Sequence, residues 1–360
     1  MAYYKSAEDI YEEMFLGYDV TDTSEGSLIY NACMPVCMKL SQSLLDLDEA
    51  TKKVFASSAV ESGYSSYLER RIKEVGIERK QPTYASTKIY VNGSPNANLK
   101  ADSIVGIKDN RLYLTQNDLV LDQDGHGEVI IRAEKPGSKY NAKVNEINYL
   151  PIKYNGITSI SNKEAVTNGY DIESDEDLYN RYLLKVRTPA TSGNPYHYKQ
   201  WCLEVEGCGS AKIYEETNDK FEAKRGSVLC VISNSNKKAA SKELIDKVKE
   251  HIEKVRPVGA TVFVVSVQEL LLNISVSLIY NSKEFTLDKV KENIINSIEE
   301  YLKKVALEVS YISIAKVGAL ILSSDGIEDY NNLTINGSTS NITVKENQIA
   351  VLGEVVCNAT

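Results

Sequence analysis

The chain has 360 residues, with 41 lysines and arginines against 50 aspartates and glutamates, so its formal net charge is −9. At roughly 150 residues per domain, this length predicts two or three domains that can each bury a core. A composition of 42% hydrophobic and 25% charged residues excludes the disordered and low-complexity classes. Because no segment is basic, the sequence also argues against binding to a nucleic-acid backbone.

The sequence contains no segment typical of membrane insertion or export. Its longest uncharged stretches, Gly26–Met38 and Leu270–Ser282, are shorter than the roughly 18–20 apolar residues that span a bilayer. The acidic amino terminus lacks the apolar core of a signal peptide. None of the six cysteines lies in a CxxC pair, which favours buried thiols in a reducing compartment. We therefore expect no membrane insertion and a reducing compartment.

Residues 1–82 show helical periodicity, which predicts a helical amino-terminal region. The stretch Thr23-Ser24-Glu25-Gly26 is typical of a helix start, and Pro35 either kinks the helix or places its true start near Met34. Apolar residues then repeat every seven positions in two neighbouring stripes, either buried within their own domain or packed against helices of another chain. The candidate bundle interface consists of Cys33, Cys37, Leu40, Leu44, Leu47 and Val54.

Residues 83–168 change to short β-like runs separated by turns rich in Gly, Asn and Asp, which predicts a small β domain. One turn, with Asp122, Asp124 and Gly125, faintly resembles a calcium loop. It lacks the third acidic ligand and the distal glutamate of such a loop, so an ordinary hairpin turn is favoured.

Residues 169–265 and 266–360 alternate strands with helices, so each predicts a domain in which helices cover one face of a small sheet. The predicted fold class is therefore α+β multidomain: a helical region, a small β domain and two α+β domains. The apolar faces of the two strongest helices are expected in the cores; they comprise Leu244, Val248, Ile252 and Val255, and Val290, Ile294, Ile298, Leu302 and Val305.

Catalytic chemistry leaves little trace in this sequence. Its three histidines are far apart, and no HExxH, GxSxG, GxxxxGK[ST] or GxGxxG motif occurs. The acidic run Asp171–Asp177 precedes a helical pattern, and its carboxylates fit the start of a helix better than a metal site. A glycosidase pair would leave no sequence signature. We predict no catalytic, cofactor-binding or metal-binding residues and no enzymatic activity.

A series of motifs is more informative than any catalytic pattern. It covers residues 167–181, 187–189 and 192–194, then Tyr198, Trp201 and 204–207, and is accompanied by residues 23–27, 63–80 and 255–260. These stretches resemble the signature of the baseplate J-like family of contractile-tailed phages and related particles. Cys208 and Asn168 depart from the residues common there. The resemblance marks the following residues, which we expect to be architectural: Gly169, Asp171, Glu173, Ser174, Asp175, Leu178, Arg181, Pro189, Gly193, Asn194, Tyr198, Trp201, Gly207, Arg256 and Pro257.

The resemblance implies a structural wedge component of the baseplate of a phage or a headless, bacteriocin-like tail particle. In that family the amino-terminal helices are thought to join a bundle with a second copy and a smaller wedge protein. The carboxy-terminal part would link neighbouring wedges into a ring around the hub, in contact with hub proteins and the sheath initiator, and transmit the contraction trigger. The resemblance also implies synthesis and assembly in the bacterial cytoplasm. It implies no nucleic acid, no direct membrane insertion and no cofactor.

Two alternative functions share some features of the sequence. A receptor-binding or adhesive tail protein would share the excess of tyrosine, 23 residues against 5 phenylalanines, because tyrosine suits contact surfaces. Such proteins are usually trimeric with repeats, and no internal repeat is evident. A tail-associated cell-wall hydrolase is the second alternative, which no motif supports.

Overall fold

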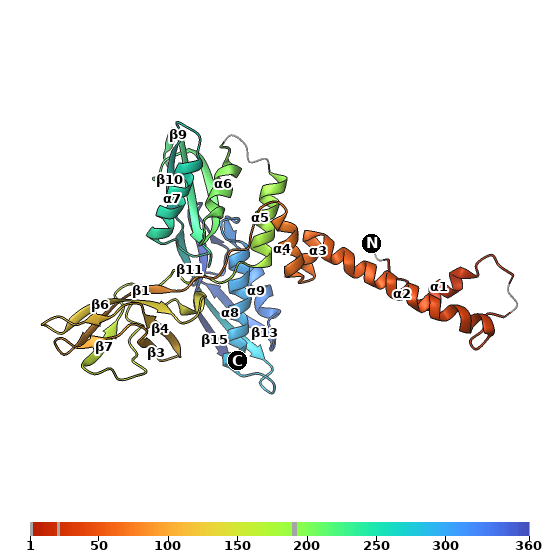
Figure 1. Ribbon diagram of the computed structural model, residues 1–360, viewed down its shortest axis with the longest axis horizontal. Helices are drawn as coiled ribbons and strands as arrows, with labels where there is room; N and C mark the ends of the chain where they lie inside the picture. Colours follow the sequence, from red (N-terminus) through yellow and green to blue (C-terminus); the bar gives the residue numbers. More distant parts are fainter. Residues whose placement is uncertain (1–2, 20–21, 189–192, 360) are drawn as a thin grey trace. The chain divides into compact units, whose positions relative to one another are not determined.

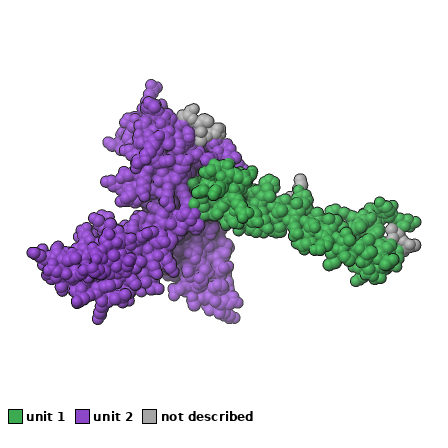
Figure 2. Space-filling model, viewed as in Figure 1, with its two compact units in different colours: residues 1–79, 174–183 green, residues 80–173, 184–360 purple. Residues whose placement is uncertain are grey.

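The computed structural model describes residues 3–19, 22–188 and 193–359, and it divides the chain into two compact units. The first comprises Met1–Arg79 and Ser174–Leu183, and the second Lys80–Glu173 and Leu184–Thr360 (Figure 2). Helices dominate the first unit and sheets with helices the second (Figure 1). The predicted α+β multidomain fold class is confirmed.

The first unit is built from helices, of which the first two begin at polar side-chain caps. The helices are α1 (Ala7–Met14), α2 (Leu28–Val54), α3 (Ala56–Glu61), α4 (Ser65–Lys73) and the first part of α5 (Asp175–Arg187). Ser6 and Asp9 form a reciprocal capping box on α1, and the Ser27 side chain caps α2. The second helix thus starts one residue after the expected stretch 23–26. It continues through Pro35, so a start near Met34 is excluded.

Two small cores stabilise the helices of this unit. In one, α1 packs on α2 through Ile10, Tyr11, Met34 and Cys37. In the other, Leu68 and Ile72 of α4 pack with Leu178 of α5 and with alanines of α3. Both cores are small because each helix contributes only a narrow apolar face.

The second unit begins with the expected β structure. Its five-stranded antiparallel sheet has the order β3-β4-β6-β1-β7, and the short strands β2 (Asn98–Leu99) and β5 (Leu119–Val120) pair beside it. Alternating inward residues such as Ile89, Val91, Val129 and Ile131 form its core. The sheet strands are β1 (Ser86–Gly93), β3 (Ile104–Ile107), β4 (Arg111–Thr115), β6 (His126–Ala133) and β7 (Ile157–Ser161).

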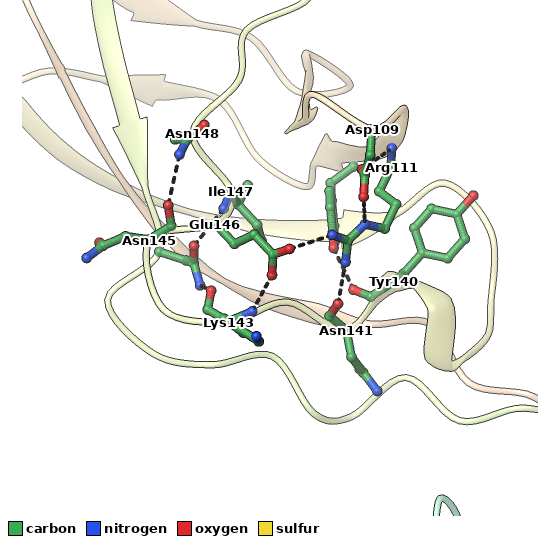
Figure 3. Close-up of polar contacts among 11 residues, drawn as sticks. Asp109, Arg111, Tyr140, Asn141, Lys143, Asn145, Glu146, Ile147 and Asn148 are labelled. Carbon is green, nitrogen blue, oxygen red and sulfur yellow. Dashed lines mark hydrogen bonds and ion pairs between the residues drawn. The ribbon is translucent and has the colours of Figure 1, made fainter. Parts of the chain in front are cut away.

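A charged network ties the irregular segment 134–150 of this β structure to strand β4 (Figure 3). The largely buried guanidinium of Arg111 donates to Asp109 at 2.7 Å, to Glu146 at 2.6 Å and to the Asn141 carbonyl at 2.7 Å. The Lys143 N–H also donates to Glu146, and this bond, helped by Arg111, holds the pKa of Glu146 below its ordinary value. A segment with only one short 3-10 turn, Ser138–Tyr140, is thereby fixed.

Two three-stranded sheets follow, each covered by helices. The first has the order β10-β9-β8, with β9 (Ala223–Asn234) antiparallel to β8 (Cys208–Thr217) and parallel to β10 (Thr261–Ser266). Its helices are α6 (Pro195–Glu204) and α7 (Lys242–Val255). Leu244, Val248 and Ile252 are buried as expected, but Val255, the last residue of α7, is exposed.

The second of these sheets has the order β13-β11-β15. Helix α8 packs on it through Val290, Ile294, Ile298 and Leu302, as expected, and Val305 is partly buried beside them. The elements of this part are β11 (Gln268–Tyr280), α8 (Leu287–Lys304), β12 (Tyr311–Ile312), α9 (Ile314–Leu322), β13 (Ile327–Ile335), β14 (Ile342–Thr343) and β15 (Gln348–Ala359).

Candidate functional site

The glycines among the marked residues lie where a side chain would collide with neighbours. Gly193 has φ +74°, and a Cβ atom there would lie 2.5 Å from Cγ of Pro257. Gly207 has φ +92°, and its Cβ would lie 2.8 Å from the ring of Tyr170. A Cβ on Gly169 would meet the Gly137 carbonyl at 2.6 Å. These three positions therefore serve close packing within the chain.

The acidic run Asp171–Asp177 supports local structure. Asp171 accepts hydrogen bonds from the backbone N–H and the hydroxyl of Ser138, and Glu173 accepts one from the Lys80 N–H at 3.0 Å. The Ser174 hydroxyl accepts from the Asp177 N–H at 3.1 Å at the start of α5. Among the residues that the structure describes, no cluster of three or more His, Cys, Asp or Glu side chains could hold a metal ion.

Asp175 takes part in a buried ion-pair cluster of the first unit. The guanidinium of Arg79, only 7% exposed, lies 2.5 Å from carboxylate oxygens of both Asp175 and Glu69. Arg181 on α5 donates to the Glu78 carbonyl at 2.6 Å, and Leu178 is fully buried on the same helix. Burial lowers the pKa of Arg79, but the hydrogen bonds to Glu69 and Asp175 outweigh it and raise the pKa above its ordinary value. The guanidinium therefore stays charged.

The remaining marked residues anchor α6 and the turn after α7. Asn194 caps α6 by accepting from the His197 N–H, and Tyr198 and Trp201 are buried in the core beneath it. Arg256 donates to the Ala260 carbonyl at 2.5 Å and thus closes the turn that contains Pro257. Pro189 lies outside the described residues.

The surface of α2 behaves differently, because apolar side chains there have no cover from the chain itself. The six residues predicted for the bundle interface fall into two groups. Cys37 is completely buried against α1, and the partly buried Cys33 and Leu44 pack at the edge of the same core. These three take part in the contact between α1 and α2.

The other three predicted residues, with Val36, form a continuous exposed line that we call the apolar stripe. Its members lie at spacings of four and seven residues, which places them on one side of the helix. Exposed Ser43 and Ala50 complete the three-and-four spacing between them. The stripe consists of Val36, Leu40, Leu47 and Val54, whose exposed fractions are 60%, 48%, 43% and 60%. The seven-residue repeat counted from Cys33 does not include Val36, so the sequence pattern alone did not indicate this residue.

The α1 helix covers the neighbouring side of α2 and leaves the stripe free. The Ser41 hydroxyl donates to the Lys5 carbonyl, and Asp48 accepts from the Tyr3 and Tyr4 N–H groups at 2.7 and 2.9 Å. These two N–H groups lower the pKa of Asp48, the bond from Tyr3 contributing most. A row of four aliphatic side chains beside an already occupied helix face is typical of a surface that receives another helix.

No helix within the described part of the chain is both long enough and apolar enough to cross a membrane. The length of α2 is sufficient, but its polar and charged residues exclude it.

Comparisons with known proteins identify relatives of the chain. Models of baseplate J-like domains match most of the chain: the barrel domain at residues 88–169, the central domain at 190–266 and the C-terminal domain at 272–358. The phage-like element PBSX protein XkdT of Bacillus subtilis is 33% identical over 342 residues, which cover 93% of this chain and 92% of the relative. Baseplate protein gp47 of Escherichia phage Mu is 30% identical over 134 residues, 37% of each chain.

The chain also aligns with a solved structure. A chain in the cryo-EM structure of the anti-feeding prophage baseplate aligns with 97% of this chain and 90% of its own length, with a TM-score of 0.38 and 10% identity.

Proposed function

Since the chain belongs to the baseplate J-like family, and is thus a structural component of a contractile-tail baseplate that contacts other baseplate proteins, we propose that it acts there as a wedge protein. Its α2 helix joins a bundle with a second copy and a smaller wedge protein. The carboxy-terminal part links neighbouring wedges into a ring around the hub, near the sheath initiator, and the chain transmits the contraction trigger.

The apolar stripe on α2 is the observation that carries this proposal. Burying an aliphatic side chain contributes about 1.5–3 kcal/mol relative to leaving it exposed, so four such residues give a partner helix a substantial driving force. Three heptads are marginal for an isolated coiled coil. The α1 helix already packed on the adjacent side supplies additional helical surface, which supports a bundle rather than a simple pair.

We further propose that the chain works in four parts, residues 1–82, 83–168, 169–265 and 266–360, and has no catalytic activity. The described signature residues support this because they hold turns, caps and cores of the fold. Burial also raises the pKa of Cys208 to about 11, so this thiol stays protonated and unreactive near neutral pH.

The test is co-expression of the chain with the products of neighbouring open reading frames, followed by native mass spectrometry of the purified complex. We expect two copies of the chain with one smaller protein. Leu47→Glu should abolish the complex, because it places a charge in the centre of the stripe. The matched control is Leu45→Glu, which alters a leucine of similar exposure, 41%, on another side of α2 and should leave the complex intact.

A chain that remains alone in the presence of every neighbouring product would contradict the proposal. So would a Leu47→Glu variant that assembles as well as the unmodified chain while circular dichroism shows that it is folded.

A further inference from the structure

The turn that joins α1 to α2 exposes three large apolar side chains, which we call the apolar tip. Leu16 is 76% exposed, Tyr18 74% and Leu28 86%, so each is more exposed than any residue of the apolar stripe. All three lie where α1 ends and α2 begins, at one end of the packed α1–α2 pair (Figure 1). A single exposed leucine is ordinary, but several large apolar side chains at one end of a helix pair are typical of a contact surface.

The apolar tip lies outside the core of the α1–α2 pair. In that core the Tyr11 ring packs edge-on against the rings of Phe15 and Tyr30, with ring centroids 5.0 and 5.4 Å apart. The Tyr11 hydroxyl donates to the Thr23 carbonyl at 3.1 Å, and the Tyr18 N–H donates to the Phe15 carbonyl at 3.1 Å. These contacts anchor both ends of the turn on the helix pair, and the three apolar side chains remain outside them.

The surroundings of the apolar tip are strongly acidic. Residues 6–38 include no lysine, arginine or histidine and seven carboxylates, which are Glu8, Asp9, Glu12, Glu13, Asp19, Asp22 and Glu25. The ion pair of Glu13 is with Lys5, which precedes this stretch. Hydrogen bonds from the Ser24 hydroxyl and N–H lower the pKa of Asp22, so its carboxylate stays ionised at neutral pH. This end of the helix pair therefore carries a negative potential around exposed apolar side chains.

We propose that the apolar tip docks into a basic surface of another protein, which offers an apolar recess to Leu16, Tyr18 and Leu28 and cations to the carboxylates around them. An apolar centre with a charged rim is the usual arrangement at contacts between proteins. Opposite charges also steer two such surfaces together and disfavour wrong partners. The inference goes beyond the proposed bundle, because the tip lies at the start of α2, ahead of the apolar stripe. It rests on the membership of the chain in a family of baseplate components.

Charge identifies a basic protein as the occupant. A nucleic-acid backbone and an anionic lipid surface carry charge of the same sign as the tip and would be repelled. A second copy of this chain fits no better, because its own tip is acidic and no segment of its sequence is basic. A basic partner gains from the carboxylates at the rim, so the contact should weaken as salt screens these charges.

The experiment uses the full-length chain co-expressed with the products of the neighbouring open reading frames. Leu16→Ser removes apolar surface from the tip, and Glu25→Lys reverses a charge at its rim. Both positions are exposed, so circular dichroism should show unchanged folding. We expect each variant to weaken the attachment of one basic subunit about tenfold or more, which native mass spectrometry would detect as its loss from the complex. As matched controls, Leu45→Ser and Glu61→Lys make the same changes at exposed positions of α2 and α3 and should retain that subunit.

Salt and lipid vesicles provide independent measurements. Raising the ionic strength should release the basic subunit from the original chain before it separates copies joined through the apolar stripe. The absence of any basic subunit from the complex would overturn the inference. So would the loss, in both variants, of a subunit that is acidic or is a second copy of this chain. Binding of the chain to vesicles of anionic phospholipid that both variants abolish would likewise overturn it.

The result can be distinguished from that of the bundle proposal. If Leu47→Glu abolishes the complex of two copies with one smaller protein while Leu16→Ser and Glu25→Lys retain every subunit, the inference on the apolar tip fails and the bundle proposal stands. If Leu16→Ser and Glu25→Lys lose the basic subunit while Leu47→Glu changes nothing, the bundle proposal fails and the inference stands.

Discussion

The α1–α2 pair and the part of the chain around α6 and α7 use apolar residues in opposite ways. Around α6, Tyr198 and Trp201 and the buried face of α7 are covered by their own sheet. On α2, one side is covered by α1 while Leu40 and Leu47 remain open to solvent. The residues that mark the family thus maintain the fold, and the residues left uncovered are the ones available for assembly.

The same contrast applies to charged groups. In the β structure, Arg111 is enclosed and has three partners within its own domain. On the surface of α2, charged side chains such as Lys52 and Glu49 form exposed pairs, which contribute little to stability. Substitutions should therefore affect folding in the enclosed regions and association on α2, and the following predictions test this separation.

The largest loss of stability is expected from Trp201→Ala. This side chain is 6% exposed and lies in contact with the rings of Tyr198 and His197, so its removal leaves a large cavity that costs about 3–5 kcal/mol. Urea unfolding followed by circular dichroism would measure it, since Trp201 is the only tryptophan and fluorescence is lost with it. Tyr196→Ala, at an exposed position of the same helix, is the control; equal effects would contradict the assignment of Trp201 to the core.

A smaller effect is expected from Arg111→Gln. It leaves the half-buried carboxylate of Glu146 without its guanidinium partner, and with allowance for the solvent that still reaches Glu146 the cost is about 1–2 kcal/mol at neutral pH. Lys88→Gln, which removes an exposed cation 3.7 Å from Glu128, should change stability by less than about 0.5 kcal/mol.

The Arg111 effect should also depend on pH in a defined direction. The pKa of Glu146 is lowered in the folded chain, so the stabilisation it provides is present above the unfolded value of 4.5 and is lost as pH falls through the folded value. The difference in the free energy of unfolding between the original chain and Arg111→Gln should therefore become smaller below about pH 4. A difference that grows on acidification would contradict the ion pair.

The sequence predicted local structure better than contacts between distant residues. Heptad spacing was sufficient to identify α2, and apolar periodicity identified the buried faces of α7 and α8, because both depend on neighbours within a few turns. The two stripes on α2 have almost the same periodicity. Only the packed position of α1, joined to α2 by an intervening loop, determines that Cys37 is buried and Leu40 is exposed.

Long-range polar contacts were beyond the sequence for a related reason. Arg111 and Glu146 are 35 positions apart, and each alone has the composition of an ordinary surface residue. The resemblance marked Gly193 and Pro257 separately. It did not indicate that the two residues lie against each other in the fold. Such contacts depend on how strands and turns meet in space, which periodicity does not encode.

The smallest effect on folding, and the sharpest test of the separation, is expected from Leu40→Ala. Leu40 is exposed in the isolated chain, so truncation should change the free energy of unfolding by no more than about 0.5 kcal/mol. Leu68→Ala, at a fully buried position in the same unit, should cost about 2–5 kcal/mol.

For binding in the co-expressed complex we expect the opposite order, with a larger effect from Leu40→Ala than from Leu68→Ala. Loss of the Leu40 side chain should weaken association about tenfold, because its apolar surface is buried only when a partner helix is present. Urea titrations of the isolated variants and binding measurements on the complex would separate the two effects. A Leu40→Ala variant that unfolds as readily as Leu68→Ala would mean that the stripe belongs to the fold of the chain itself.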